Sequence, residues 1–308
     1  MAALLLSLLA TWPHAAMGGD DGDPHTAPPA CDLSFDSGRR AVTGIIDGET
    51  LRLDDRREVK LIGALAPRAP DATDATDGRS DWPPEVEARA TLERLALGRS
   101  ARLGFAGPRH DRYGRLLAHV VLVADEGGSI WLQGAMLASG HARAYGIPGS
   151  YACSDALLAA EAAARHRRSG LWSTDAYRPR SALRTRELLH LAGSYQLVEG
   201  RVQSATRVKE RLYVNFGRDW RQDFSLSVAP ELARANPAWA AGLLMLAGRR
   251  VRARGWITRR NGPMIEIDDA SQLEVLDAPP APPDEAGADD ATAPDNGART
   301  ETQPRAPR

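Results

Sequence analysis

The stretch VKLIGALAPR, residues 59–68, decides the fold of the first half of the chain. It opens with alternating apolar and polar side chains, which is typical of a strand with one buried face. An Asp-Gly pair at 47–48 lies upstream between two apolar runs, as in a hairpin turn. The sequence therefore predicts two strands joined by a turn between residues 40 and 67.

Working outward, the chain continues as one compact unit that ends near Trp172. Its first helix begins with a Pro pair at 83–84 and ends at Gly98, residues that favour those positions. The remaining expected elements are strands near 100–105 and over 116–123, and helices over 130–139 and 154–168. The helix over 83–98 places Ala88 and Leu92 on one face.

A second β-rich unit follows. Five short strands are expected, with a helical stretch over 230–248 between the third and the fourth. Five strands with a helix after the third is the plan of an OB barrel. The predicted fold class is β-rich α+β, with two OB-fold-like five-stranded barrels, the first carrying three helices. The predicted strands lie within 195–205, 211–217, 223–228, 249–257 and 264–276.

The two ends of the chain differ in composition from its body. Residues 1–18 form a short apolar run without a preceding Lys or Arg, which indicates a signal peptide or an uncleaved anchor. Residues 277–308 are acidic and rich in Pro and Ala, so we expect a disordered tail. The expected organisation is a signal or anchor at 1–18, a linker at 19–40, a first domain at 41–175, a linker at 176–194, a second domain at 195–276 and the tail at 277–308.

The charge of the chain is unevenly distributed. The net charge is −1, but residues 41–276 carry 34 basic and 28 acidic side chains, a net charge of +6. A basic body suits a polyanionic partner such as nucleic acid. The alternative is that heavy use of Arg reflects genome composition. No P-loop, zinc-ligand spacing or dinucleotide fingerprint is present.

Four motifs in order resemble one family, the staphylococcal-nuclease-like or thermonuclease domain. They are IIDGETLRL, VKLIGALAPR, DRYGRLLA and GLW, spread over residues 41–172. The resemblance implies an OB barrel with three helices that cleaves DNA and RNA phosphodiesters with Ca²⁺. It further implies two metal-binding aspartates, a glutamate base and two arginines. The stretch YVNFGRDWRQDFSLSV also resembles second domains that accompany such domains in some bacterial proteins.

Three of the implied catalytic positions keep a charge. Glu49 stands where the first metal-ligand aspartate is expected, one methylene longer, and a displacement of about 1 Å can cost about a hundredfold in rate. Lys60 stands where the first arginine is expected and lacks its planar fork. Arg115, in DRYGR, matches the second arginine. By resemblance, the predicted catalytic residues are Arg115, Lys60 and Glu49.

The two other positions hold different chemistry. Leu65 replaces the second aspartate, and a leucine cannot bind calcium. Arg68 replaces the glutamate base and places a cation where an anion is needed. The catalytic centre is therefore expected to be degenerate at Leu65 and Arg68.

The affinity for calcium should be lowered by these replacements. Glu49 remains with Asp47 as the candidate metal ligands, and so few carboxylates predict at most a very weak site. A rescue would need the loop acids Asp47, Asp54 or Asp71 to approach Glu49.

The cations of this region offer a different use. Lys60, Arg68 and Arg115 could converge on one cleft and hold a phosphate or another anion. In the alternative, Arg68 points to water and pairs with Glu49 or Asp71. His110 and His119 lie nearby, but lone histidines at such positions are more often structural.

The second unit has a cationic strand. In RRVRARGWI, Arg250, Arg252, Arg254 and Trp256 share one side of the strand by period-two geometry. Cations and stacking rings together bind single-stranded nucleic acid, and Tyr213 could extend this platform. The alternative is an outward strand face that is merely solvated.

Two cysteines, Cys31 and Cys153, are candidates for one disulfide if the protein is exported. Two unpaired thiols are the alternative.

These features give a leading interpretation and an alternative. The leading one is an exported thermonuclease-family protein of a bacterial periplasm or medium, a phosphodiester hydrolase whose activity is weak or absent. The alternative is a non-catalytic protein of the cell envelope that binds single-stranded DNA, RNA or another anion. A structural scaffold is the third.

Overall fold

The computed structural model describes residues 30–69, 82–123 and 128–277. The expected signal or anchor at 1–18, the tail from residue 278 onward and Asp71 lie outside this part. No helix in the described ranges is both long and apolar enough to span a membrane.

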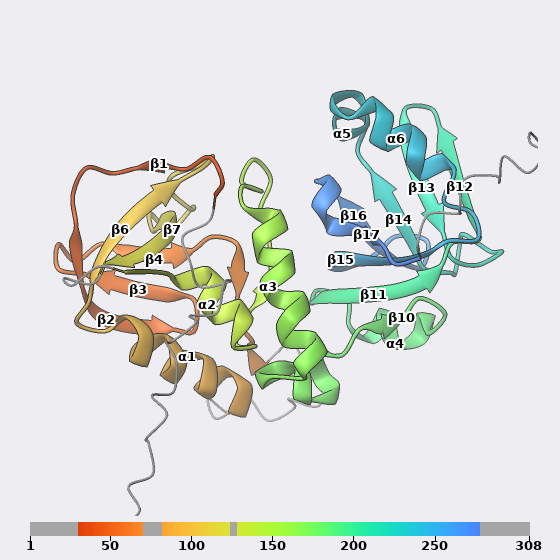
Figure 1. Ribbon diagram of the computed structural model, residues 1–308. Helices are drawn as coiled ribbons and strands as arrows, with labels where there is room; N and C mark the ends of the chain where they lie inside the picture. The colour runs from red at the N-terminus through yellow and green to blue at the C-terminus, as the bar shows by residue number, and fades with distance from the viewer. Residues whose placement is uncertain (1–29, 70–81, 124–127, 278–308) are drawn as a thin grey trace, which may run out of the picture. The chain divides into compact units, whose positions relative to one another are not determined.

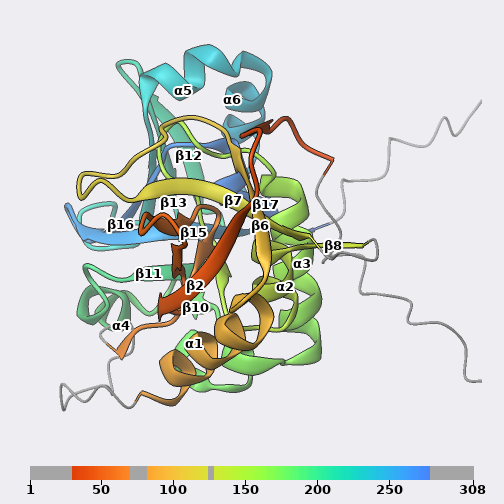
Figure 2. The ribbon, with the colours of Figure 1, turned by 90° about the vertical axis from the view of Figure 1, so that its left-hand side faces the viewer.

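Five strands close the first barrel. Antiparallel pairing joins the first strand to the second and the second to the third, and the third then pairs in parallel with the fifth. The fourth strand pairs with both the fifth and the first, which closes the ring. In chain order the strands are β2 (Arg40–Asp47), β3 (Thr50–Leu53), β4 (Glu58–Leu61), β6 (Ser100–Phe105) and β7 (Leu116–Val123). β1 (Ser34–Phe35) and β8 (Ser129–Trp131) extend the sheet, and Figure 2 shows this barrel with α1 across one end.

Helices cover this barrel where the sequence predicts them. α1 (Pro83–Ala96) begins with its Pro pair and is followed by Gly98, whose φ of +76° suits a helix end. Its apolar face, with Ala88 and Leu92, is buried in the barrel core. α2 (Leu132–Ala138) and α3 (Ser154–Arg167) complete the set of three.

The second barrel repeats the strand plan of the first. The third strand again pairs in parallel with the fifth, and the fourth pairs with the fifth and the first. Its first strand is divided by a bend, and one half pairs with the fourth strand and the other with the second. The strands are β11 (Tyr195–Arg201) and β12 (Ser204–Val208), β13 (Arg211–Asn215), β14 (Ser225–Val228), β15 (Arg250–Arg259) and β16 (Pro263–Ile267). The predicted β-rich α+β fold with two barrels is thereby confirmed.

Short elements complete the second barrel. The expected helical stretch over 230–248 is two helices, because Pro237 starts a new one and has no N–H to continue the first. These are α5 (Pro230–Ala235) and α6 (Pro237–Leu244). Outside the barrel ring lie β10 (Arg180–Ser181), α4 (Thr185–His190), the 3₁₀ turn η5 (Ala270–Gln272) and β17 (Leu273–Val275).

The two barrels share a junction. α3 runs between them (Figure 1), and a small apolar cluster holds side chains from both. The short strands β5 (Ala64–Leu65) and β9 (Arg143–Ala144) pair beside this cluster. The turns η3 (Gly170–Ser173) and η4 (Asp175–Tyr177) lead from α3 towards the second barrel.

Candidate functional site

Glu49 is buried at the turn between β2 and β3, with 1% of its surface exposed. Asp47 Oδ1 accepts the backbone N–H of Glu49 at 2.8 Å, which shapes the turn. A Cβ at Gly48 would lie 2.9 Å from those of Ala66 and Ala88, so only glycine lets the turn pack this closely. The backbone N–H of Ala66 donates to Glu49 Oε2 at 3.0 Å. The carboxylate is therefore fixed from several sides.

Two cations hold this carboxylate. Lys60 Nζ and Arg68 Nη2 both donate to Glu49 Oε1. The Lys60 side chain is 16% exposed and that of Arg68 is 49% exposed, whereas Glu49 lies beneath them. We call these three residues the Glu49 cluster. Two cations thus face one carboxylate, so Glu49 has no charge left over for a metal ion.

The remaining sequence-predicted residues do not join the cluster. Leu65 is 6% exposed and packs in the apolar cluster at the junction of the barrels. Arg115 forms an ion pair with Asp111 at 2.7 Å and lies over the ring of Tyr113. In the described ranges Arg115 makes no ion pair with Glu49. Lys60 and Arg68 meet at Glu49, whereas Arg115 pairs with Asp111, so the convergence of all three cations on one cleft stays a prediction.

The donor set does not fit a calcium ion. Calcium takes six to eight oxygen ligands, several from carboxylates. Glu49 already pairs with two cations, Asp47 accepts the backbone N–H of Glu49, and Asp54 accepts the backbone N–H of Ala41 at 3.3 Å. Across residues 30–69, 82–123 and 128–277, no three Asp, Glu, His or Cys side chains gather where they could hold a metal.

Comparison with known proteins assigns most of the first domain to a family. Residues 59–174 match the family described as staphylococcal nuclease homologue. This part of the chain is a staphylococcal nuclease-like domain. No curated protein matches the chain. Members of the family generally use Ca²⁺ and act on nucleic acid.

The second barrel covers the edge of the nuclease-like domain beside this cluster. Tyr195 packs with Leu65, and its hydroxyl donates to the carbonyl of Ala144 at 3.1 Å. Tyr195, Tyr145 and Trp256 meet edge to face, with centroids 5.3–6.4 Å apart. This contact places rings of the second barrel against the nuclease-like domain.

Tyr145 connects these rings to the Glu49 cluster. Burial raises the pKa of Tyr145, and the Glu49 carboxylate raises it further. A hydrogen bond with Trp256 and the charge of Arg68 act on this pKa in the opposite direction. Tyr145 therefore lies within electrostatic reach of Glu49 and Arg68 on one side and meets Trp256 on the other.

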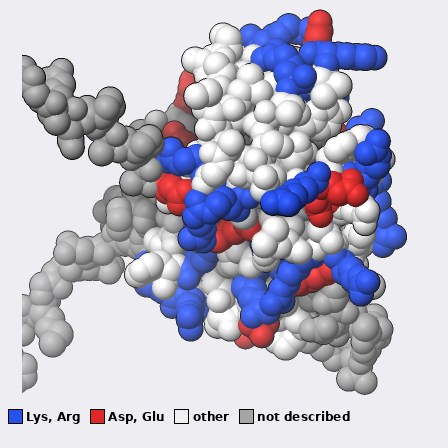
Figure 3. Space-filling view, turned by 90° about the vertical axis from the view of Figure 1, so that its right-hand side faces the viewer, with Lys and Arg blue, Asp and Glu red and all other residues white. Residues whose placement is uncertain are grey.

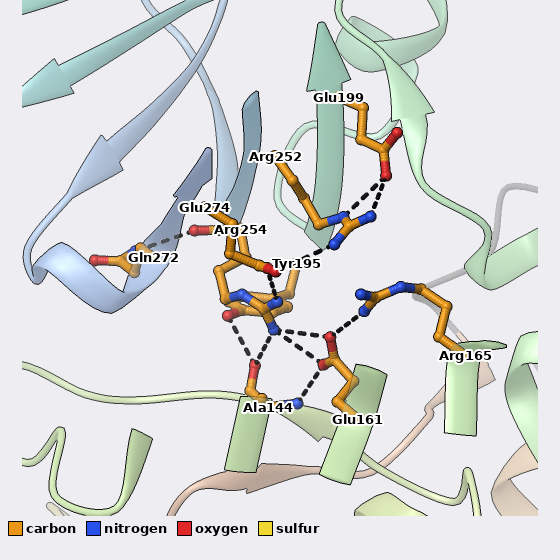
Figure 4. Close-up of polar contacts among 9 residues, drawn as sticks. All are labelled: Ala144, Glu161, Arg165, Tyr195, Glu199, Arg252, Arg254, Gln272 and Glu274. Carbon is orange, nitrogen blue, oxygen red and sulfur yellow. Dashed lines mark hydrogen bonds and ion pairs between the residues drawn. The ribbon is translucent and has the colours of Figure 1, made fainter. Parts of the chain in front are cut away.

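The arginines of β15 share a face, but this face is not open. Arg254 is 3% exposed and lies 3.0 Å from Glu161 of α3 and 2.5 Å from Glu274 of β17 (Figure 4). Arg252 pairs with Glu199 at 2.7 Å and with Glu274 at 3.1 Å. The predicted cationic platform is therefore largely neutralised by acids. Nucleic-acid binding by this strand stays a prediction.

The outer residues of the platform lie elsewhere. Arg250 is half exposed and pairs with Glu199 at 3.3 Å. Trp256 is 44% exposed but turns its ring to Tyr145 and Tyr195. Tyr213 is on β13, where it lines a separate pocket of about 570 Å³.

The junction uses residues that the sequence analysis passed over. Glu161 is fully buried, accepts the N–H of Ala144 at 2.7 Å and pairs with Arg165 and Arg254. Arg143 is 2% exposed and donates to the carbonyl of Tyr195 at 2.5 Å. The signal for Glu161 was a single acid in the alanine-rich run LLAAEAAA.

The two histidines and the two cysteines singled out in the sequence differ in their contacts. His119 is 1% exposed and accepts a hydrogen bond from Trp131 Nε1 at 3.3 Å, whereas His110 is exposed on the loop before β7. Cys31 and Cys153 are joined as a disulfide, which ties the segment before β1 to the start of α3.

Proposed function

We propose that the protein is a non-hydrolytic relative of the nucleases that binds nucleic acid without cleaving it. The observation that carries this proposal is the Glu49 cluster. Hydrolysis of a phosphodiester in this family needs an anionic pocket for a metal and a base for the attacking water. Glu49 instead forms ion pairs with Lys60 and Arg68, and Leu65 packs in the apolar cluster at the junction of the barrels.

Binding is supported by the family match and by charge. The nuclease-like domain is of a family that acts on nucleic acid, and the body of the chain is basic. This favours the non-catalytic alternative over an impaired enzyme. A carboxylate that is held by two cations supplies neither a metal site nor a free base.

We further propose that the protein works outside the cytoplasm, in the periplasm or the medium. The disulfide between Cys31 and Cys153 supports this location, because disulfides persist in oxidising compartments and are rare in the cytosol.

A paired cleavage and binding assay tests the proposal. The protein is incubated with labelled single-stranded DNA and Ca²⁺ beside an active nuclease of the same family, and fragments and mobility shifts are scored. We expect a complex that weakens with salt and no fragments above background. Isothermal titration with Ca²⁺ should show no saturable binding.

Glu49→Gln is the diagnostic variant. In a metal-dependent enzyme the loss of this carboxylate would abolish cleavage. Here it should change only stability, because Lys60 and Arg68 lose their shared partner. Calcium-dependent cleavage by the unaltered protein that disappears in Glu49→Gln would overturn the proposal.

A further inference from the structure

The second barrel carries a pocket of about 570 Å³ away from the Glu49 cluster. This volume lies within the usual range of ligand sites. The pocket is lined by strands β12, β13, β14 and β16 and by the turns at 217–220 and 260–261.

The strand register builds a polar floor. Ser204 lies opposite Asn215, Asn215 opposite Ser225, and Ser225 opposite Met264, so one row crosses four strands. Asn215 Nδ2 donates to Ser204 Oγ at 3.3 Å. Small hydroxyl and amide side chains at the floor leave room above the sheet and offer donors and acceptors to a ligand.

The charge of the lining is positive. Arg218 and Arg260 line the pocket, and no Asp or Glu does. Both arginines are exposed, and neither forms an ion pair with another residue of the described ranges. Figure 3, viewed from the side of β12 and β13, shows Lys and Arg side chains around a broad uncharged area.

The acidic residues on the neighbouring loop and strand already form other hydrogen bonds and ion pairs. Asp223 accepts the N–H of Asp219 at 2.9 Å, and Asp219 accepts that of Arg221 at 3.0 Å, so both shape the loop between β13 and β14. Glu266 on β16 pairs with Arg211 at 2.7 Å. The two pocket arginines therefore remain available for anionic groups of a ligand.

Aromatic rings complete the site. Trp220 is 49% exposed at the rim, and the guanidinium of Arg221 lies 4.5 Å from its ring centroid. Tyr213 stands on the middle strand of the same face. Exposed rings beside unpaired cations are the combination that binds bases and phosphates of a single strand.

We propose that this pocket is the site where the protein holds single-stranded nucleic acid, with Trp220 and Tyr213 stacking on bases and Arg218 and Arg260 pairing with phosphates. The ligand class rests on the proposed function, whereas the location rests on the pocket itself. A neutral oligosaccharide could also stack on Trp220, but it would leave the two arginines without counter-charges.

Fluorescence anisotropy of the full-length protein tests the site. The probe is a labelled oligothymidylate of about 12 nucleotides, within the site size of one OB fold, titrated in EDTA so that no metal acts. Trp220→Ala should weaken binding about tenfold, the loss expected for one stacked base. Arg218→Ala with Arg260→Ala should reduce the slope of log affinity against log salt by about 1.4, at about 0.7 per phosphate contact.

A charge-matched control separates the pocket from the general basic surface. Arg89 on α1 and Arg186 on α4 are exposed and lie outside the pocket, so their double change to Ala should leave affinity within about twofold and the salt slope unchanged. All these side chains are on the surface, and circular dichroism verifies folding of each variant.

The possible outcomes are distinct. Pocket variants that bind the oligothymidylate as tightly as the unaltered protein would overturn the pocket site and leave the proposed function standing. Cleavage in the separate calcium assay would overturn the proposed function and leave the pocket site standing. Binding of a chito-oligosaccharide that depends on Trp220, with no binding of the oligothymidylate, would overturn the nucleic-acid assignment.

Discussion

At the scale of single residues, the chemistry of the nuclease-like centre depends on what surrounds each carboxylate. Glu49 keeps its charge and its burial, yet Lys60 and Arg68 saturate the oxygen that a metal would need. The buried carboxylate of Glu49 stabilises the fold only while Lys60 and Arg68 remain, because a buried charge without a partner lowers stability. In the described structure the Glu49 carboxylate is therefore part of an ion-pair cluster that stabilises the fold.

His119 gives a pH-dependent test at this scale. Burial lowers its pKa from the ordinary 6.5 to about 4. The folded state therefore favours the neutral ring. The contribution of His119 to the free energy of unfolding is fully present above pH 6.5 and is lost as the pH falls towards 4. Each pH unit in this window corresponds to about 1.4 kcal/mol, so the total loss is about 3 kcal/mol.

His119→Gln isolates this contribution, because glutamine offers an acceptor to Trp131 Nε1 and does not titrate. Urea unfolding at a series of pH values should show the wild type losing about 3 kcal/mol relative to the variant between pH 7 and pH 4. Parallel stability curves for the two proteins would show that His119 titrates normally in the fold.

The residue scale also shows where sequence reasoning succeeded and failed. The alternation at the start of VKLIGALAPR was sufficient to predict the strand β4, whereas the missing ligand at Leu65 stays a prediction from the resemblance. The alternation could not show that Tyr195 of the second barrel packs on Leu65, because that contact joins residues 130 positions apart. A leucine that only removes a ligand and a leucine that builds a junction look the same in sequence.

At the scale of elements, β15 shows how alternation misleads. Period-two geometry correctly places Arg250, Arg252 and Arg254 on one side, and the burial of the strand alternates accordingly near its start. What faces that side is set by tertiary structure, and α3 supplies Glu161 from 93 residues away. The sequence predicts the face of a strand, but not its neighbour.

Arg254 is therefore expected to act in stability. Burial lowers the pKa of its guanidinium, but Glu161, Tyr195 and Glu274 together outweigh this effect, so the pKa is raised overall. Glu161→Gln leaves Arg254 with Glu274 alone in a buried site and should cost about 3 kcal/mol. Arg254→Met with Glu161→Gln should cost less than the sum of the single changes, with a coupling of about 1–3 kcal/mol.

Arg250→Met is the matched control on the same strand. Its side chain is half exposed, so its pair with Glu199 should contribute less than about 1 kcal/mol. Denaturant unfolding of all four variants checks the comparison. Additive losses for Arg254 and Glu161 would mean that the two side chains do not interact in solution.

At the scale of the whole molecule, the two barrels have the same strand order but use it differently. The first barrel contributes β5 and β9 to the junction, and the second contributes β11 and β15. The junction lies beside the Glu49 cluster, whereas the pocket around Trp220 lies on the outer face of the second barrel. The proposed binding pocket therefore lies apart from the junction of the barrels.

The disulfide between Cys31 and Cys153 closes a long loop of the chain. Cys31 and Cys153 are 122 positions apart, so the bond limits the unfolded chain over most of the first barrel. In the chain-entropy treatment, a loop of this length contributes about 4–5 kcal/mol. Reduction, or Cys31→Ser with Cys153→Ser, should lower the free energy of unfolding by about that amount, as measured by urea denaturation.

Comparison of the reduced protein with the double variant shows whether the missing disulfide causes the loss in the free energy of unfolding. Reductant should have no effect on the double variant, and the m-value of both should rise because an uncrosslinked chain exposes more surface when it unfolds. If the loss were much smaller than expected, the segment before β1 would contribute little to the fold and the bond would act locally. A full loss requires that β1, paired to β6, remains part of the barrel up to global unfolding.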